Sequence, residues 1–205
     1  MISIVDYGVG NVQAFLNLFN RLGIEAKRAN TSTILKESSH LVLPGVGHFD
    51  HAMKKLNNSG LREPLEDLVI GSKIPLLGIC VGMQMLANES EEGVLPGLGW
   101  ISAKVRAFSN NKNSLQLPLP HMGWNNINIK KSILLSEKKI NPFTEFYFLH
   151  SYYFDAVDKS IVSATSNYGL NFDSMISYKN IHGVQFHPEK SHKWGEELLK
   201  SFSKL

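Results

Sequence analysis

Cysteine is nearly absent from this chain, which has a single one, Cys80, among 205 residues. One cysteine cannot form an internal disulfide, so a disulfide-stapled extracellular fold is excluded. The sequence also lacks any run near the roughly 18 apolar residues that a membrane span needs. Residues 1–6 lack the basic region that precedes the apolar part of a signal peptide. We therefore expect a cytoplasmic protein.

Concentrated positive charge is missing as well. Lys and Arg total 21 against 18 Asp and Glu, and the resulting net charge of +3 is spread along the chain. Nucleic-acid binding favours a basic stripe, whereas only two short lysine pairs occur, at 130–131 and 138–139. The composition, 43% hydrophobic and 19% charged, is typical of a soluble globular protein. We expect one domain over residues 1–205, with neither a nucleic-acid nor a membrane partner.

The first half of the sequence alternates short apolar runs with helical spacing. The predicted strands cover residues 2–5, 24–28 and 41–43 and the run that leads into Cys80. The predicted helices follow apolar stripes at 15–22, 49–56 and 61–69. This order predicts an α/β fold, a mostly parallel twisted sheet flanked by helices, with functional loops at the carboxyl ends of the strands.

The second half is rich in β-branched and aromatic residues. Its predicted strands cover residues 101–108, 124–129, 145–150, 151–154, 161–165, 174–178 and 181–185. We expect them to form antiparallel additions to the edge of the sheet, followed by a closing helix at 194–202. The polar, then proline-rich stretch 109–120 predicts a surface loop.

Cys80 lies in a G-x-C-x-G segment, residues 78–82, between an apolar run and a helix-like run at 83–87. This is the cysteine version of the strand–turn–helix elbow that exposes a nucleophile above a sheet. Glycines flank the cysteine because side chains would clash in so tight a turn. The amino end of the following helix favours the thiolate. Cys80 is therefore a candidate nucleophile.

A cysteine nucleophile needs a base and a group that orients the base. His187 and Glu189 supply both, since His187 follows a predicted strand and Glu189 lies just across a proline. The carboxylate can hold one imidazole nitrogen while the other faces the sulfur. Taken alone, His-Pro-Glu is also typical of a capped surface turn. Together with the cysteine elbow, it predicts a Cys–His–Glu triad.

The glycine-rich segment 44–47 follows a buried strand and precedes a helix. Backbone N–H groups at such a place can form an oxyanion hole, and a peptide that reorients there can switch it on and off. A plain glycine turn between strand and helix is the alternative.

These motifs resemble those of the triad-type, or class I, glutamine amidotransferases. In that family a G-x-C-x-G elbow and a later F-H-P-E motif carry a Cys–His–Glu triad. The triad hydrolyses the side-chain amide of glutamine through a glutamyl thioester. More specific strings resemble the members that act as separate glutaminase subunits beside a (β/α)₈-barrel cyclase of histidine biosynthesis. These strings lie at 6–11, 44–49, 120–125 and 146–153. The resemblance covers essentially the full chain.

The resemblance implies Cys80 as nucleophile, His187 as general base and then acid, and Glu189 as the group that orients the base. It also implies oxyanion-hole N–H groups at Val46 and Gly47. The glutamine contacts that it implies are Gln84, Glu92, His150, Ser151 and Tyr152. The partner interface and ammonia exit that it implies involve Asn11, Met122 and Trp124.

The resemblance further implies a heterodimer with the barrel subunit and low activity until the partner binds its acceptor and 45–47 reorients. The other histidines show no regular ligand spacing, so we expect no metal, and nothing points to a cofactor.

Three alternatives remain at this stage. Residues 49–56 and 190–195 look closer to paralogues that supply ammonia for amidation of a surface-polysaccharide sugar. A second alternative is a non-catalytic scaffold for a barrel partner, and a third is a cysteine peptidase.

Overall fold

The computed structural model describes residues 1–110, 117–131, 134–135 and 144–205. Its strands are β1 (Ile2–Val5), β2 (Ala26–Ala29), β3 (His40–Gly45), β4 (Leu76–Cys80), β5 (Glu89–Ser90), β6 (Ala103–Ala107), β7 (His121–Asn126), β8 (Asn128–Ile129), β9 (Glu145–His150), β10 (Tyr152–Ala156), β11 (Val162–Asn167), β12 (Asn171–Tyr178) and β13 (Ile181–Val184). Its α-helices are α1 (Val12–Arg21), α2 (Ser32–Lys36), α3 (Phe49–Asn58), α4 (Arg62–Glu66), α5 (Val81–Gln84) and α6 (His192–Phe202). Short helical turns are η1 (Asp67–Gly71), η2 (Phe108–Asn110), η4 (Lys159–Ile161) and η5 (Pro188–Lys190).

Among the described residues, the main sheet has eleven strands, with β2-β1-β3-β4-β13-β12-β10-β6-β5 as its principal order. The strands β2, β1, β3, β4 and β13 are parallel. From β13 outward the pairs β13–β12, β12–β10 and β10–β6 are antiparallel. This arrangement confirms the predicted mostly parallel sheet with antiparallel edge additions.

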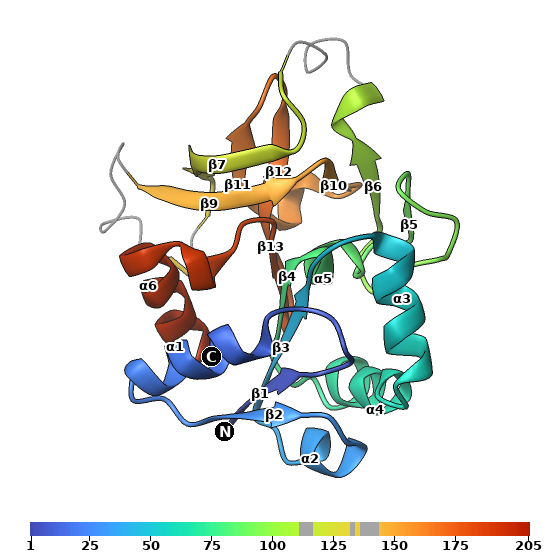
Figure 1. Ribbon diagram of the computed structural model, residues 1–205, viewed down its shortest axis with the longest axis vertical. Helices are drawn as coiled ribbons and strands as arrows, with labels where there is room; N and C mark the ends of the chain where they lie inside the picture. The colour runs from blue at the N-terminus through green and yellow to red at the C-terminus, as the bar shows by residue number, and fades with distance from the viewer. Residues whose placement is uncertain (111–116, 132–133, 136–143) are drawn as a thin grey trace.

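Helices cover both faces of the parallel part of the sheet. Figure 1 shows α1 and α6 on one side of it and α3 and α4 on the other. Strands β1 and β4 are buried along their whole length, as expected for a parallel sheet with two covered faces. The amphipathic helices α1 and α3 turn Phe15, Phe19, Phe49 and Met53 into this core. No helix of the described residues has the length and apolar character that a membrane crossing needs.

Three second-half strands differ from the expectation of antiparallel additions to the edge of the sheet. Strand β13 is parallel to β4 and lies inside the sheet, and its four residues form the continuous buried run typical of such a strand. Strands β7 and β9 pair antiparallel in a separate two-stranded sheet.

The helical predictions need three corrections. The helix after Cys80 ends at Gln84, because the carbonyls of residues 85–87 accept hydrogen bonds from residues 98–101 instead. The stripe at 61–69 forms α4 and then the π-type turn η1. Helix α2 was not predicted. Much of the predicted loop 109–120 lies outside the described residues.

Candidate active site

The cysteine elbow has the conformation that its glycines predict. Cys80 ends β4 with φ 53° and ψ −114°, a left-handed backbone that a non-glycine residue adopts at a cost. A Cβ on Gly82 would lie 1.9 Å from the carbonyl oxygen of Leu43, and one on Gly78 would lie 2.8 Å from the oxygen of Gly82. Only glycine fits at these two positions, which confirms the steric reason given for the motif.

His187 reaches the same edge of the sheet from the neighbouring strand. Strands β4 and β13 pair in parallel, with Val184 opposite Ile79, so both chains leave the sheet side by side. The His187 Nδ1 lies 2.8 Å from Glu189 Oε1, and both side chains are buried. The structure thus brings Cys80, His187 and Glu189 together.

The protonation of His187 is set by opposing effects. Burial lowers the pKa of His187, but the charge of the Cys80 sulfur, a hydrogen bond with it, and Glu189 raise the pKa to about 10. Because Nδ1 faces Glu189, the other ring nitrogen is the one that faces the sulfur. The raised pKa therefore favours the imidazolium form of His187, which can give a proton to a leaving group.

A buried serine, Ser191, holds the turn that carries His187. Its Oγ donates to the His187 carbonyl at 2.6 Å and accepts from the Tyr147 amide at 3.0 Å. The His187 amide in turn donates to the Tyr147 carbonyl at 2.8 Å. Strand β9 therefore fixes the η5 turn. Nothing in the sequence motifs indicated this role for Ser191.

A cavity of about 510 Å³ opens over the triad. Eleven of the sequence-predicted site residues line it, namely Asn11, Val46, Gly47, Cys80, Gln84, Glu92, His150, Ser151, Tyr152, His187 and Glu189. It is also lined by four residues that were not predicted, Val81, Pro120, Leu149 and Lys190.

The predicted oxyanion segment is anchored at Pro44 and Gly45, ahead of the exposed residues Val46 and Gly47. The Tyr7 hydroxyl donates to the Pro44 carbonyl at 2.7 Å, and burial raises the pKa of Tyr7, which keeps it a donor. Gly45 packs so closely that a Cβ there would lie 2.3 Å from the Gly82 nitrogen. Beyond it, Val46 is exposed and Gly47 has φ +80°, a conformation that glycine adopts easily. The chain is thus fixed up to Gly45 and exposed at Val46 and Gly47, before α3 begins.

Gln84 lines the cavity and is backed by a second, fully buried glutamine, Gln185. The Gln84 amide nitrogen donates to the Tyr152 carbonyl at 2.9 Å and to Gln185 Oε1 at 3.0 Å. Gln185 Nε2 donates to Cys80 Sγ at 3.7 Å. The amide hydrogens of Gln84 are therefore engaged within the protein. Gln185 was missed by the sequence analysis, although its place two residues before His187 was a usable signal.

Glu92 presents a second carboxylate to the cavity, besides that of Glu189. Its Oε2 accepts a hydrogen bond from the Phe49 amide at 2.8 Å. Burial and the charge of Asp50 raise the pKa of Glu92, whereas the Phe49 amide and His48 lower it, and the net shift is upward. A half-buried carboxylate of this kind suits the ammonium group of an amino acid.

His150 lines the cavity and pairs with a second buried imidazole, that of His121. His150 Nδ1 lies 2.8 Å from the Tyr152 carbonyl, and its Nε2 lies 2.9 Å from His121 Nδ1. Since a carbonyl only accepts, His150 donates from Nδ1 and accepts the proton of His121 at Nε2. Burial lowers the pKa of His150 to about 3 and that of His121 to about 4, so both rings are neutral. No motif of the sequence indicated this role for His121.

Met122 and Trp124 do not line the cavity. They lie on β7 with 65% and 45% of their surfaces exposed, and Trp124 stacks on His192 at 5.2 Å. Asn11 is different, because it lines the cavity and also caps α1 by accepting from the Ala14 amide at 3.1 Å.

The site as a whole has the parts of an acyl-transfer centre. A thiol, a base oriented by a carboxylate and a glycine-rich backbone segment surround one cavity. Within the described parts of the chain, no three His, Cys, Asp or Glu side chains gather as metal ligands would.

The sequence matches the family described as glutamine amidotransferase class-I over residues 3–204. It is 52% identical over 207 residues to the imidazole glycerol phosphate synthase subunit HisH of Bdellovibrio bacteriovorus, with 100% of both chains covered. It is 47% identical over 206 residues to the protein of the same name from Leptospira borgpetersenii, again with 100% of both covered. A crystal structure described as a glutamine amidotransferase matches with a TM-score of 0.75 at 19% identity, covering 99% of this chain and 97% of that one, and supports the fold alone.

Proposed function

Because the chain belongs to the glutamine amidotransferase class-I family, we propose that it is the glutaminase subunit of an imidazole glycerol phosphate synthase. It hydrolyses L-glutamine to glutamate and ammonia. The observation that carries this proposal is the triad geometry, in which Cys80 ends β4, His187 follows the neighbouring parallel strand β13, and Glu189 Oε1 lies 2.8 Å from His187 Nδ1. The full-length relatives that carry this name support the histidine pathway.

The reaction uses the triad twice. The Cys80 sulfur attacks the side-chain amide carbon, and the backbone N–H groups of Val46 and Gly47 stabilise the developing oxyanion. His187 gives its proton to the leaving nitrogen, so ammonia departs and a glutamyl thioester remains. The base then takes a proton from water, which attacks the thioester and releases glutamate and the thiolate. Glu189 orients the imidazole throughout.

The cavity also fits the other end of glutamine. Glu92 binds the α-ammonium group, and the polar wall around Ser151 and Tyr152 receives the α-carboxylate. Gln84 supports this wall through its hydrogen bond to the Tyr152 carbonyl, and His150 supports it through the same oxygen.

The ammonia passes to a (β/α)₈-barrel cyclase subunit in a heterodimer. Free ammonia at neutral pH is mostly protonated and non-nucleophilic, so direct transfer is needed. The partner uses it to form imidazole glycerol phosphate and the aminoimidazole carboxamide ribonucleotide. Two observations support a docking surface for the partner on this face. The apolar side chains of Met122 and Trp124 on β7 are exposed, and Asn11 lines the cavity.

Partner binding also controls the rate. The segment beyond Gly45 is exposed and includes a glycine with positive φ, so a peptide there can rotate without disturbing the anchored Pro44. The subunit alone is slow, and the loaded partner turns the N–H of this segment toward the oxyanion.

Glutamate release is the direct test. Wild type and Cys80→Ser are assayed alone, with the barrel partner, and with the partner and its ribonucleotide acceptor. We expect wild-type release that is stimulated by the loaded partner and abolished by Cys80→Ser. No release under any of these conditions would favour the scaffold alternative, and peptide cleavage without glutamine hydrolysis would favour the peptidase. Stimulation only by a sugar-amidating partner would assign the subunit to surface-polysaccharide synthesis instead of histidine biosynthesis.

A further inference from the structure

The loop between β5 and residue 95 carries Glu92, yet it has no regular secondary structure around that side chain. A carboxylate that binds the ammonium group of a substrate must be held within a fraction of an ångström of its binding position. The loop therefore needs supports, and the structure shows one on each side of Glu92.

The first support is Asp50, in the first turn of α3. Its Oδ1 accepts hydrogen bonds from the Val94 and Leu95 amides at 3.1 and 3.0 Å, and its Oδ2 accepts from Val94 at 3.0 Å. These bonds lower the pKa of Asp50, with the Val94 amide as the largest cause, so the carboxylate stays charged. Gly93 makes the approach possible, because a Cβ there would lie 1.9 Å from Asp50 Oδ1.

The same helix orients Glu92 directly. The Phe49 amide, one residue before Asp50, donates to Glu92 Oε2 at 2.8 Å. Helix α3 thus holds the Glu92 side chain through a backbone donor and the following backbone through a carboxylate. Since α3 begins two residues after Gly47, the helix that holds the loop is also the one that follows the oxyanion segment.

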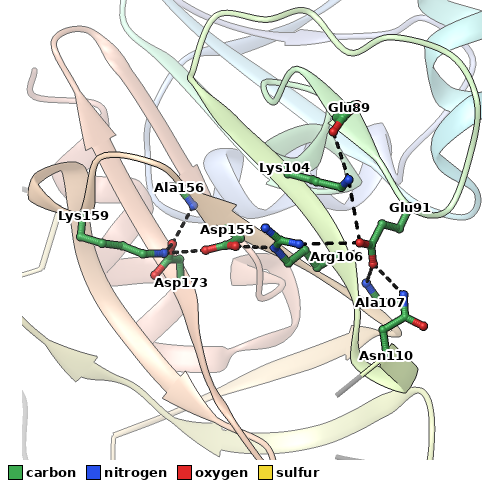
Figure 2. Close-up of polar contacts among 10 residues, drawn as sticks. All are labelled: Glu89, Glu91, Lys104, Arg106, Ala107, Asn110, Asp155, Ala156, Lys159 and Asp173. Carbon is green, nitrogen blue, oxygen red and sulfur yellow. Dashed lines mark hydrogen bonds and ion pairs between the residues drawn. The ribbon is translucent and has the colours of Figure 1, made fainter. Parts of the chain in front are cut away.

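The second support is Glu91, on the opposite side of the loop. Its Oε2 accepts from the Ala107 amide at 2.8 Å and from Asn110 Nδ2 at 2.9 Å. Figure 2 shows Glu91 inside a row of alternating charges that begins at Glu89, passes through Lys104 to Glu91, and continues through Arg106, Asp155 and Lys159 to Asp173. Exposed ion pairs add little stability, so the support that Glu91 gives the loop lies in its hydrogen bonds to the Ala107 amide and to Asn110.

We propose that Asp50 is a positioning residue for substrate recognition, which holds Glu92 in place by binding the backbone of Val94 and Leu95. The proposal rests on the proposed glutaminase function, because it assigns Glu92 the α-ammonium group of glutamine. Asp50 itself does not line the cavity, so it acts through Glu92 and not on the substrate.

The test compares glutamine with an analogue that lacks the α-amino group. For each substrate kcat/KM is measured in the complex with the barrel partner and its acceptor. Asp50→Ala should lower kcat/KM for glutamine about tenfold and leave that for the analogue nearly unchanged. The loss should lie mainly in KM, and Glu92→Gln should give the same selective loss. The double variant should lose little more, because both changes remove one interaction.

Matched variants separate positioning from folding. Asp158→Ala removes a comparable backbone-capping aspartate, which accepts from the Ser160 amide at 2.8 Å, and should leave the selectivity unchanged. If Asp50→Ala does not fold, Gly93→Ala is used, since its methyl group meets the Asp50 carboxylate and should cause the same selective loss.

An equal loss for both substrates, or none in a folded Asp50→Ala protein, would overturn the role of Asp50 while leaving the glutaminase function intact. Absence of glutamate release by the wild-type complex would instead overturn the proposed function itself.

Discussion

His187 Nδ1 and Glu189 Oε1 lie 2.8 Å apart, two residues from one another across Pro188. The proline at the start of η5 fixes the backbone between them, so the carboxylate and the imidazole keep one geometry. This pair decides which ring nitrogen faces Cys80 and keeps the ring charged, because Glu189 contributes to the raised pKa of His187.

Replacing Glu189 with Gln should therefore slow glutamine hydrolysis. The amide keeps the size of the side chain but removes the charge that stabilises the imidazolium, and a loss of about 10²–10⁴ in kcat is expected for impaired acid–base catalysis. Steady-state glutamate release in the partner complex measures it. Unchanged kcat would contradict an orienting role for Glu189. Glu196→Gln on the outer part of α6 is the control.

Adding a methyl group at Gly82 should prevent or strongly destabilise folding. The new Cβ would lie 1.9 Å from the Leu43 carbonyl oxygen, and backbone cannot yield as a flexible side chain can. Gly71→Ala is the matched control, since a Cβ there meets no atom within 4 Å. Thermal melting of both variants tests this, and similar Tm values for the two would refute the steric account of the elbow.

Three buried histidines outside the triad predict a loss of stability on acidification. Burial lowers the pKa of His182 to about 4, and the values for His121 and His150 are lowered to about 4 and about 3. Such groups bind protons more readily when unfolded. The stability they contribute is complete above pH 6.5 and is lost as the pH falls toward their folded pKa values. From pH 7 to pH 5 the free energy of unfolding should fall by on the order of 2 kcal/mol for each histidine.

Urea unfolding at the two pH values measures this slope. His182→Gln should make it shallower, whereas His51→Gln, on the exposed face of α3, should leave it as in wild type. An identical slope in His182→Gln and wild type would show that His182 is not buried in its neutral form.

The exposed apolar surface on β7 predicts a docking defect. Met122→Asp places a charge where the partner would remove water, so affinity for the barrel subunit should fall at least about tenfold. Val157→Asp is the control, because Val157 is 75% exposed at the far end of β10 from Tyr152. Calorimetric titration compares the two, and equal affinities would place the interface elsewhere.

The sequence predicted the parts of this protein that repeat a local pattern. The alternation of apolar runs and helical stripes led to the parallel sheet, and the glycines around Cys80 led to the elbow. Residues that act over a long sequence distance could not be predicted in this way. Gln185, 105 positions from Cys80, approaches the sulfur only because β13 lies beside β4, and the sequence analysis placed β13 at an antiparallel edge.

The same limit applies to Asp50 and Ser191. Both act through hydrogen bonds to backbone amides of distant segments. Every residue except proline has such an amide, so residue types do not show which amide is bound. Ser191 and Asp50 therefore look like ordinary polar residues at helix starts. Trp124 and Met122 were recognised only through the family resemblance, since their exposure depends on the separate β7–β9 sheet.

The central claim is that Cys80 attacks the side chain of bound glutamine. Because Cys80 is the chain's single cysteine, the mass of the protein after treatment with an electrophilic glutamine analogue reports on it directly. In the partner complex the account predicts one covalent adduct, located at Cys80 and slowed by saturating glutamine. No adduct at Cys80, or one that forms equally fast in excess glutamine, would contradict the account.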